Sequence, residues 1–309
     1  MMPEIKLFMF QSGTQHCRYQ HIRMNQGVGE HYEIPVPWFL LTHPDGFTLI
    51  DDGLAVEGLK DPSGYWGSAV EQFKPVMSEE QGCVEQLKRI GIAPEDIRYV
   101  VLSHLHSDHT GAIGRFPHAT HVVQRQEYEY AFAPDWFTSG AYCRRDFDRP
   151  QLNWLFLNGL SDDHYDLYGD GTLQCIFTPG HSPGHQSFLI RLPGGTNFTL
   201  AIDAAYTLDH YHEKALPGLM TSATDVAQSV RKLRQLTERY HAVFIPGHDP
   251  EEWKKTGLRQ PVTIESFLAD RQKASVKQGC QLILFEMALV MAGAISAGKL
   301  RASRPARHD

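Results

Sequence analysis

Histidines and an aspartate are crowded into one short stretch of the chain, SHLHSDHTG, at residues 103–111. The potential metal ligands in it are His104, His106, Asp108 and His109. Neutral imidazoles need hydrogen-bond partners and charged ones repel one another, so such crowding is costly unless something binds the cluster. A bound cation removes this cost, because imidazole nitrogens and carboxylate oxygens are ligands that zinc takes in proteins. The stretch therefore predicts a metal site.

Three more candidate ligands stand alone in later motifs: His181 in PGHSPGH, Asp203 in IDAAY and His248 in PGHD. Seven nitrogen and oxygen ligands are too many for one tetrahedral zinc ion and suit two adjacent ions. In this interpretation Asp203 bridges the two ions, since a carboxylate has two oxygens. No cysteine lies in any of these motifs, so we predict two zinc ions, with iron, manganese and cobalt as alternatives.

The metal motifs all follow segments that are predicted to be strands. These segments are rich in β-branched and aromatic residues and end at Gly, Pro, Asp or Asn; they cover residues 5–10, 36–43, 47–51, 98–103, 120–124, 173–178, 186–192, 197–203 and 241–246. Loops beyond the carboxyl ends of strands converge in α/β sheets, so the motifs are expected to meet. Helices are predicted at 79–90 and 224–240, and Ser222 with Asp225 resembles a capping box for the second of these.

The overall composition is that of an ordinary globular protein. The chain has 309 residues, 42% hydrophobic and 21% charged, with a formal net charge of −7. That balance argues against a nucleic-acid partner and favours small-molecule partners. The five cysteines are an odd number without a CxxC pair, and the first residues read as a strand and not as a signal peptide. We therefore expect a reduced, cytoplasmic setting.

The chain ends in a segment of different character. We expect one large domain over residues 1–260, followed by a helical extension and basic tail over 261–309. Residues 280–298 are apolar enough to reach the length of a membrane span, but Glu286 near the middle disfavours insertion. A helix buried in the fold or in a homodimer contact is the favoured interpretation. Membrane attachment and a loosely ordered tail are the alternatives.

The motif His104-Leu-His106-Ser-Asp108-His109, followed by the single ligands in the same order, resembles the metallo-β-lactamase superfamily. The resemblance covers roughly residues 5–255. It implies an α/β fold of four layers, an αββα sandwich with the metals at one edge. The stretches SHLHSDHTG, TPGHSPGHQS, IDAAYT and PGHD together look like the N-acyl-homoserine lactone lactonases. This narrower resemblance implies a quorum-quenching enzyme that opens lactone rings.

The resemblance also implies roles for individual residues. Tyr206, three residues after Asp203, would help to hold the substrate carbonyl. Two cations would lower the pKa of a bridging water, which then attacks the lactone carbonyl as hydroxide. Asp108 would bind metal and carry the proton to the leaving ring oxygen. His185 matches the second histidine of HSPGH, and we expect it to support the site and not to bind metal.

One departure from the lactonase pattern concerns the pocket wall. Ser107 stands where some lactonases carry an aromatic residue, which leaves the acyl-chain preference open. The strongly aromatic insertion 132–157 is a candidate cap for the acyl chain, although its rings would equally serve to pack inserted helices. The alternatives to a lactonase are a related hydrolase of γ-butyrolactone, thioesters or β-lactams, an iron oxygenase-type member, and a non-catalytic metal-binding descendant.

Overall fold

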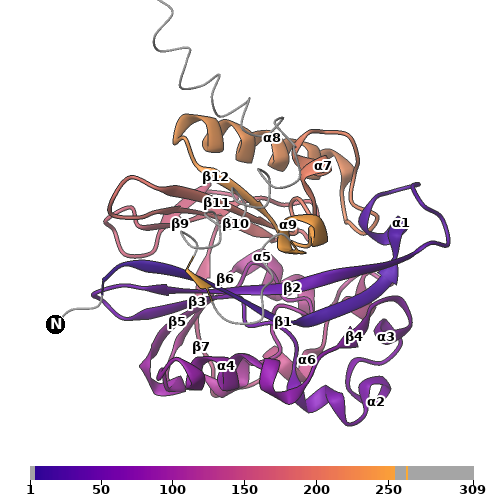
Figure 1. Ribbon diagram of the computed structural model, residues 1–309, viewed down its shortest axis with the longest axis horizontal. Coiled ribbons are helices and arrows are strands. Elements are labelled where there is room, and N and C mark those ends of the chain that lie inside the picture. The colour runs from indigo at the N-terminus through magenta and orange to yellow at the C-terminus, as the bar shows by residue number, and fades with distance from the viewer. Residues whose placement is uncertain (1–3, 255–261, 264–309) are drawn as a thin grey trace, which may run out of the picture. The chain divides into compact units, whose positions relative to one another are not determined.

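Two sheets stacked face to face form the centre of the fold, and helices cover both outer faces (Figure 1). The computed structural model describes residues 4–254 and 262–263. Helix α8 lies over one sheet, while α4 and α6 lie beneath the other (Figure 1). The arrangement confirms the predicted αββα sandwich.

The larger sheet has eight strands among the described residues, in the order β13-β1-β2-β3-β5-β6-β7, with β4 paired to β1. Strands β1, β2 and β3 are antiparallel, whereas β3, β5, β6 and β7 run parallel. The bounds are β1 Lys6–Arg18, β2 His31–Thr42, β3 Phe47–Ile50, β4 Lys74–Val76, β5 Ile97–Val101, β6 Thr120–Gln124, β7 Asn153–Leu157 and β13 Val262–Thr263.

The smaller sheet has five strands in the described part of the chain, in the order β12-β11-β10-β9-β8. Their bounds are β8 His164–Asp166, β9 Leu173–Phe177, β10 Gln186–Arg191, β11 Asn197–Ile202 and β12 Val243–Pro246. Both β9 and β11 are antiparallel to β10, and β12 is parallel to β11. The carboxyl ends of β9, β11 and β12 therefore lie at one edge of this sheet.

The helices that cover the sheets are short except for α8. The α-helices are α1 Tyr19–Ile22, α2 Pro62–Trp66, α3 Ala69–Gln72, α4 Cys83–Arg89, α5 Arg125–Phe132, α6 Arg144–Phe147, α7 Leu208–Tyr211, α8 Ala223–Arg239 and α9 Pro250–Lys254. The 3₁₀ helices are η1 Val56–Leu59, η2 Glu79–Gln81, η3 Pro94–Asp96, η4 Ile113–Arg115 and η5 Ser139–Ala141. One face of α8 packs on the five-stranded sheet, where Val226 and Leu233 join a core cluster with Phe244. Ser222 begins this helix, and its side chain accepts a hydrogen bond from the Asp225 N–H at 3.2 Å.

Two predicted elements differ from those observed. The predicted helix 79–90 is divided into η2 and α4, because Gly82 between them has extended backbone angles. Strand β1 continues past the predicted residue 10 through an irregularity between Gln11 and Thr14. Gly13 makes this irregularity possible, since it has φ +69° and a Cβ atom there would lie 2.4 Å from Met77 Cβ.

The aromatic insertion 132–157 contains both helix and strand. After η5 and α6 its last residues form β7, which pairs in parallel with β6, so the hypothesis of inserted helices is correct only for its first part. Most of its rings pack into or against the core, among them Phe147, which is fully buried. Trp136 and Phe137 are different, because 88% and 51% of their surfaces are exposed.

The predicted C-terminal extension 261–309 lies outside the described residues apart from β13, as does the apolar segment 280–298. The domain boundary at residue 260 therefore stays a prediction. Within residues 4–254 and 262–263, no helix combines the length and the apolar character that crossing a membrane requires. The four cysteines in this part of the chain, Cys17, Cys83, Cys143 and Cys175, are free and buried.

Candidate metal centre

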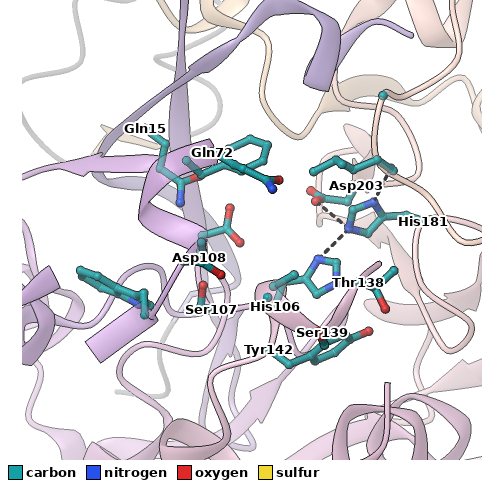
Figure 2. Close-up of a pocket in the computed structure, with 18 of the residues that line it drawn as sticks. Gln15, Gln72, His106, Ser107, Asp108, Thr138, Ser139, Tyr142, His181 and Asp203 are labelled. Atoms are coloured by element: carbon teal, nitrogen blue, oxygen red, sulfur yellow. Dashed lines mark hydrogen bonds and ion pairs between the residues drawn. The ribbon is translucent and has the colours of Figure 1, made fainter. Parts of the chain in front are cut away.

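All seven predicted ligands come together at the sheet edges, from the loops that follow β5, β9, β11 and β12. They form two groups, and within each group the ligand atoms lie within 4.8 Å of one another. One group is His104, His106, His181 and Asp203, and the other is Asp108, His109 and His248. Figure 2 shows four of these side chains converging on one space.

The first group has the spacing of a metal site. His181 Nε2 lies 2.9 Å from His106 Nδ1, 3.1 Å from His104 Nε2 and 3.2 Å from Asp203 Oδ2. Ligand atoms on a tetrahedral zinc ion are about 3.4 Å apart, given bonds of about 2.1 Å. Burial lowers the pKa of each of the three histidines, which keeps the imidazoles neutral and able to ligate.

Asp203 faces both groups. Its Oδ2 points to the first group, while its Oδ1 lies 3.0 Å from His248 Nε2 and 3.6 Å from His109 Nε2. This is the placement that a bridging carboxylate needs. Asp203 Oδ1 and His109 Nε2 are buried, yet neither makes a hydrogen bond of normal geometry with any described residue. Buried polar atoms are rarely left in this state, so the residues fit a pair of cations.

Asp108 completes the second group from a more open position. Its Oδ1 lies 3.6 Å from His109 Nε2 and its Oδ2 lies 3.9 Å from His248 Nε2. The side chain is 15% exposed, whereas that of Asp203 is only 5% exposed. Asp108 is thus the carboxylate of the centre that solvent and a bound substrate can reach.

Asp51, a residue that the sequence analysis missed, supports one ligand from each group. Its Oδ2 lies 2.8 Å from His109 Nδ1, and the same oxygen accepts a hydrogen bond from Ser103 Oγ at 2.8 Å. Ser103 Oγ in turn lies 2.9 Å from His104 Nδ1. Such bonds fix the tautomer and the orientation of ligating imidazoles. Asp51 has φ +55°, a strained backbone conformation of the kind that collects at functional sites.

Glu127 on α5 was also missed, and it ties together the loops that carry the ligands. Its Oε1 accepts hydrogen bonds from the Leu105 N–H at 3.0 Å and the Tyr142 hydroxyl at 3.2 Å. Its Oε2 accepts bonds from the Ser182 hydroxyl at 2.6 Å and the Gly184 N–H at 3.1 Å. Burial raises the pKa of Glu127, and these four donors oppose that effect by stabilising the carboxylate.

His185 lies beside the centre without joining either group. Its Nε2 accepts a hydrogen bond from the Asp203 N–H at 3.2 Å, and its Nδ1 lies 3.2 Å from the Thr178 carbonyl oxygen. Burial lowers the pKa of His185 to about 3, so the ring stays neutral and Nε2 stays an acceptor. The side chain therefore holds the backbone of the residue that faces both ligand groups.

Tyr206 contacts the first group through His181. Its hydroxyl oxygen lies 3.0 Å from His181 Nδ1 and 3.5 Å from the Leu219 carbonyl oxygen. Burial, together with the charges of Asp203 and Asp108, raises the pKa of this hydroxyl well above its usual value. Tyr206 is therefore a protonated hydrogen-bond donor at neutral pH.

A cavity of about 570 Å³ opens onto both ligand groups. Five predicted ligands line it, namely His106, Asp108, His181, Asp203 and His248. Ser107 and the exposed rings of Trp136 and Phe137 also line it. The rest of the wall is mixed, with polar side chains such as Gln15 and Gln72 and the apolar side chains Ile22, Ile34, Leu54, Trp66 and Phe73. The two ligand groups thus lie in a pocket large enough for a small molecule with an apolar part.

Comparisons with known proteins agree with this geometry. The family model described as the metallo-beta-lactamase superfamily matches residues 32–248. The N-acyl homoserine lactonase AttM of Agrobacterium fabrum is 60% identical over 252 residues, which cover 82% of this chain and 96% of that protein. The N-acyl homoserine lactonase AiiA of Bacillus thuringiensis subsp. kurstaki is 31% identical over 252 residues, covering 81% and 95% of the two chains.

A solved structure extends the similarity to three dimensions. An N-acyl homoserine lactone hydrolase, with the product N-hexanoyl-L-homoserine bound at its catalytic metal center, matches with a TM-score of 0.73 and 29% identity. The match covers 84% of this chain and 98% of that one.

Proposed function

Because this chain belongs to the metallo-beta-lactamase superfamily, we propose that it is a two-zinc hydrolase that opens the lactone ring of N-acyl homoserine lactones. The observation that carries the proposal is the pair of ligand groups joined by Asp203 at the wall of an open cavity. The substrate class is supported by the relatives at 60% and 31% identity, both N-acyl homoserine lactonases. Zinc is supported by a ligand set made only of imidazoles and carboxylates.

In the proposed mechanism, some of these residues bind the cations and one of them, Asp108, also transfers a proton. Cations bound at the two groups would lower the pKa of a water between them and polarise the lactone carbonyl. His104, His106 and His181 would hold one cation, and Asp108, His109 and His248 the other, with Asp203 between them. Asp108, the more exposed carboxylate, would take the proton of the attacking water and deliver it to the ring oxygen as the C–O bond breaks.

Tyr206 would donate a hydrogen bond to the oxygen of the reacting carbonyl. When His181 Nε2 faces a cation, Nδ1 carries the ring proton and can donate it to the Tyr206 oxygen at 3.0 Å. The hydroxyl proton of Tyr206 can then turn from the Leu219 carbonyl oxygen, which is 3.5 Å away, toward the cavity that Tyr206 lines. A donor aimed at the place where negative charge develops stabilises the transition state.

Tyr206→Phe is expected to keep both metal ions and to slow the enzyme. Removal of one oxyanion donor typically lowers kcat ~10²–10³-fold when that donor acts alone. Here a cation shares the task, so we expect a smaller loss, of about tenfold to a hundredfold. Steady-state kinetics on the best lactone, with metal analysis of the same sample, measure both quantities. Unchanged kinetics would remove Tyr206 from the mechanism.

A longer acyl chain is expected to raise kcat/KM, because part of the cavity wall is apolar and can bury the chain. An acyl chain gains about 0.8 kcal/mol per buried CH₂, so each added pair of methylenes should raise kcat/KM about tenfold until the pocket is full. Ser107 leaves more room than an aromatic side chain, which favours medium or long chains. A series from γ-butyrolactone through butanoyl to dodecanoyl homoserine lactone measures the slope. A flat series, or one in which γ-butyrolactone is best, would contradict this preference.

The exposed rings of the insertion provide a direct test of that slope. Replacing Trp136 and Phe137 together by alanine should flatten the dependence on chain length and leave the shortest substrates nearly unaffected. Leu160→Ala is the matched control, because Leu160 is 73% exposed and is not among the residues that line the cavity. An unaltered slope in the double variant would mean that the acyl chain follows another wall.

One assay separates the proposed function from its alternatives. Acid release, followed with a pH indicator, is compared across acyl lactones, γ-butyrolactone, thioesters and β-lactams. Turnover of thioesters or β-lactams without any lactone would place the chain elsewhere in the superfamily and leave the metal ligands as assigned. Absence of all turnover in the metal-loaded protein would favour a binding protein, and a visible iron spectrum with iron by elemental analysis would favour an oxygenase.

A further inference from the structure

Gln15 is a buried polar side chain in the wall of the active-site cavity. It lies on β1, where its Cα pairs with that of Ile34, and it is only 4% exposed. Its Oε1 is shielded from solvent and has no hydrogen-bond partner among residues 4–254 and 262–263. Buried side-chain acceptors are nearly always paired, so an unpaired carboxamide oxygen on a residue that lines a ligand cavity marks a place where the ligand can supply the partner.

The position of Gln15 suits a group close to the reacting carbonyl. Figure 2 shows Gln15 on the same side of the cavity as Asp108, with His181 and Asp203 on the other side. In an N-acyl homoserine lactone the amide nitrogen is attached to the carbon next to the lactone carbonyl. A substrate whose lactone carbonyl lies at the ligand groups therefore has its amide only a few bonds away, within the same cavity.

We propose that Gln15 hydrogen-bonds the amide of the N-acyl substituent and thereby distinguishes N-acyl homoserine lactones from unsubstituted lactones. This inference rests on the proposed function. The unpaired Oε1 is an acceptor, which is what the amide N–H of the substrate needs, and rotation of the carboxamide can present this oxygen to the cavity. A lactone without the amide leaves Gln15 unpaired, and a site built to hydrogen-bond a substrate group rejects analogues that lack the group.

The test combines one variant with substrates that differ only at the amide. Gln15→Met keeps the length of the side chain and removes both polar atoms. We expect kcat/KM for N-hexanoyl homoserine lactone to fall about threefold to tenfold, the effect of one neutral hydrogen bond. The loss on γ-butyrolactone, and on the analogue with an ester oxygen in place of the amide N–H, should be at least threefold smaller. Gln151→Met is the matched control, because Gln151 is exposed and is not among the residues that line the cavity.

Thermal unfolding separates recognition from a structural role. Gln15→Met removes an unpaired buried polar atom, so its Tm should equal or exceed that of the wild type. A lower Tm, with an equal loss of rate on all three substrates, would show that Gln15 is structural and would overturn the inference. An unaltered preference for the amide substrate in Gln15→Met would overturn it as well. Failure of the wild type to open any lactone would instead contradict the proposed function.

Discussion

Asp203→Ala is expected to release one of two metal ions and to lower kcat/KM on the best lactone by about a thousandfold or more. Its two oxygens face different ligand groups, at 3.2 Å from His181 Nε2 and 3.0 Å from His248 Nε2. No other described carboxylate forms close contacts with histidines of both groups, since those of Asp51 and Asp108 are to His109 and His248 alone. A catalytic cation contributes several kcal/mol of transition-state stabilisation, and each 1.36 kcal/mol is about tenfold in rate.

Elemental analysis of gently purified protein measures this prediction together with the rate. The wild type should carry about two ions per chain, and Asp203→Ala about one. Asp162→Ala is the control, because Asp162 is an exposed aspartate outside both ligand groups. Two ions retained by Asp203→Ala would show that Asp203 does not bridge. A fully active wild type with one ion or none would contradict the two-ion centre itself.

The ligands were predictable from sequence because they stand in short motifs after predicted strands. His104, His106, Asp108 and His109 are nearly consecutive, so their meeting depends on one loop and not on the whole fold. Asp51 and Glu127 carry no such local signal. Asp51 acts on Ser103, 52 residues later, and Glu127 on Ser182, 55 residues later. A single carboxylate on a strand end or in a first helical turn is usually solvated, and only tertiary packing reveals otherwise.

The secondary structure likewise divides into elements that have a local sequence signal and elements that depend on tertiary pairing. The strands predicted within two residues of their observed bounds are β3, β5, β6, β9, β10, β11 and β12, since their local pattern agrees with their place in the sheets, whereas β1 and β2 extend farther than predicted. Strand β7, Asn153–Leu157, was expected only as part of an aromatic insertion, because residues 154–157 are all apolar and do not alternate with polar ones. Its conformation is decided by parallel pairing with β6, which is 29 or more residues earlier in the chain and leaves no local trace.

Glu127→Gln is expected to weaken both the fold and the metal site, although the two side chains have the same shape. Each oxygen of Glu127 accepts one backbone N–H and one hydroxyl, from Leu105 and Tyr142 on one side and from Gly184 and Ser182 on the other. Whichever oxygen the amide NH₂ replaces, it then faces a backbone N–H that cannot accept. A buried donor left unpaired costs about 1–3 kcal/mol, so we expect the free energy of unfolding to fall by that amount.

The metal site should respond because Glu127 holds the backbone between His104 and His106 against the loop that follows His181. Residues that position metal ligands typically contribute 10–100-fold in metal affinity, and we expect a loss in this range for Glu127→Gln. Denaturant unfolding with and without a chelator, and metal titration of the stripped protein, measure the two effects. Glu129→Gln is the control, since Glu129 lies on the same helix with its side chain 68% exposed. If Glu127→Gln lowers the free energy of unfolding but leaves the metal affinity unaltered, Glu127 stabilises the fold and does not position the metal ligands.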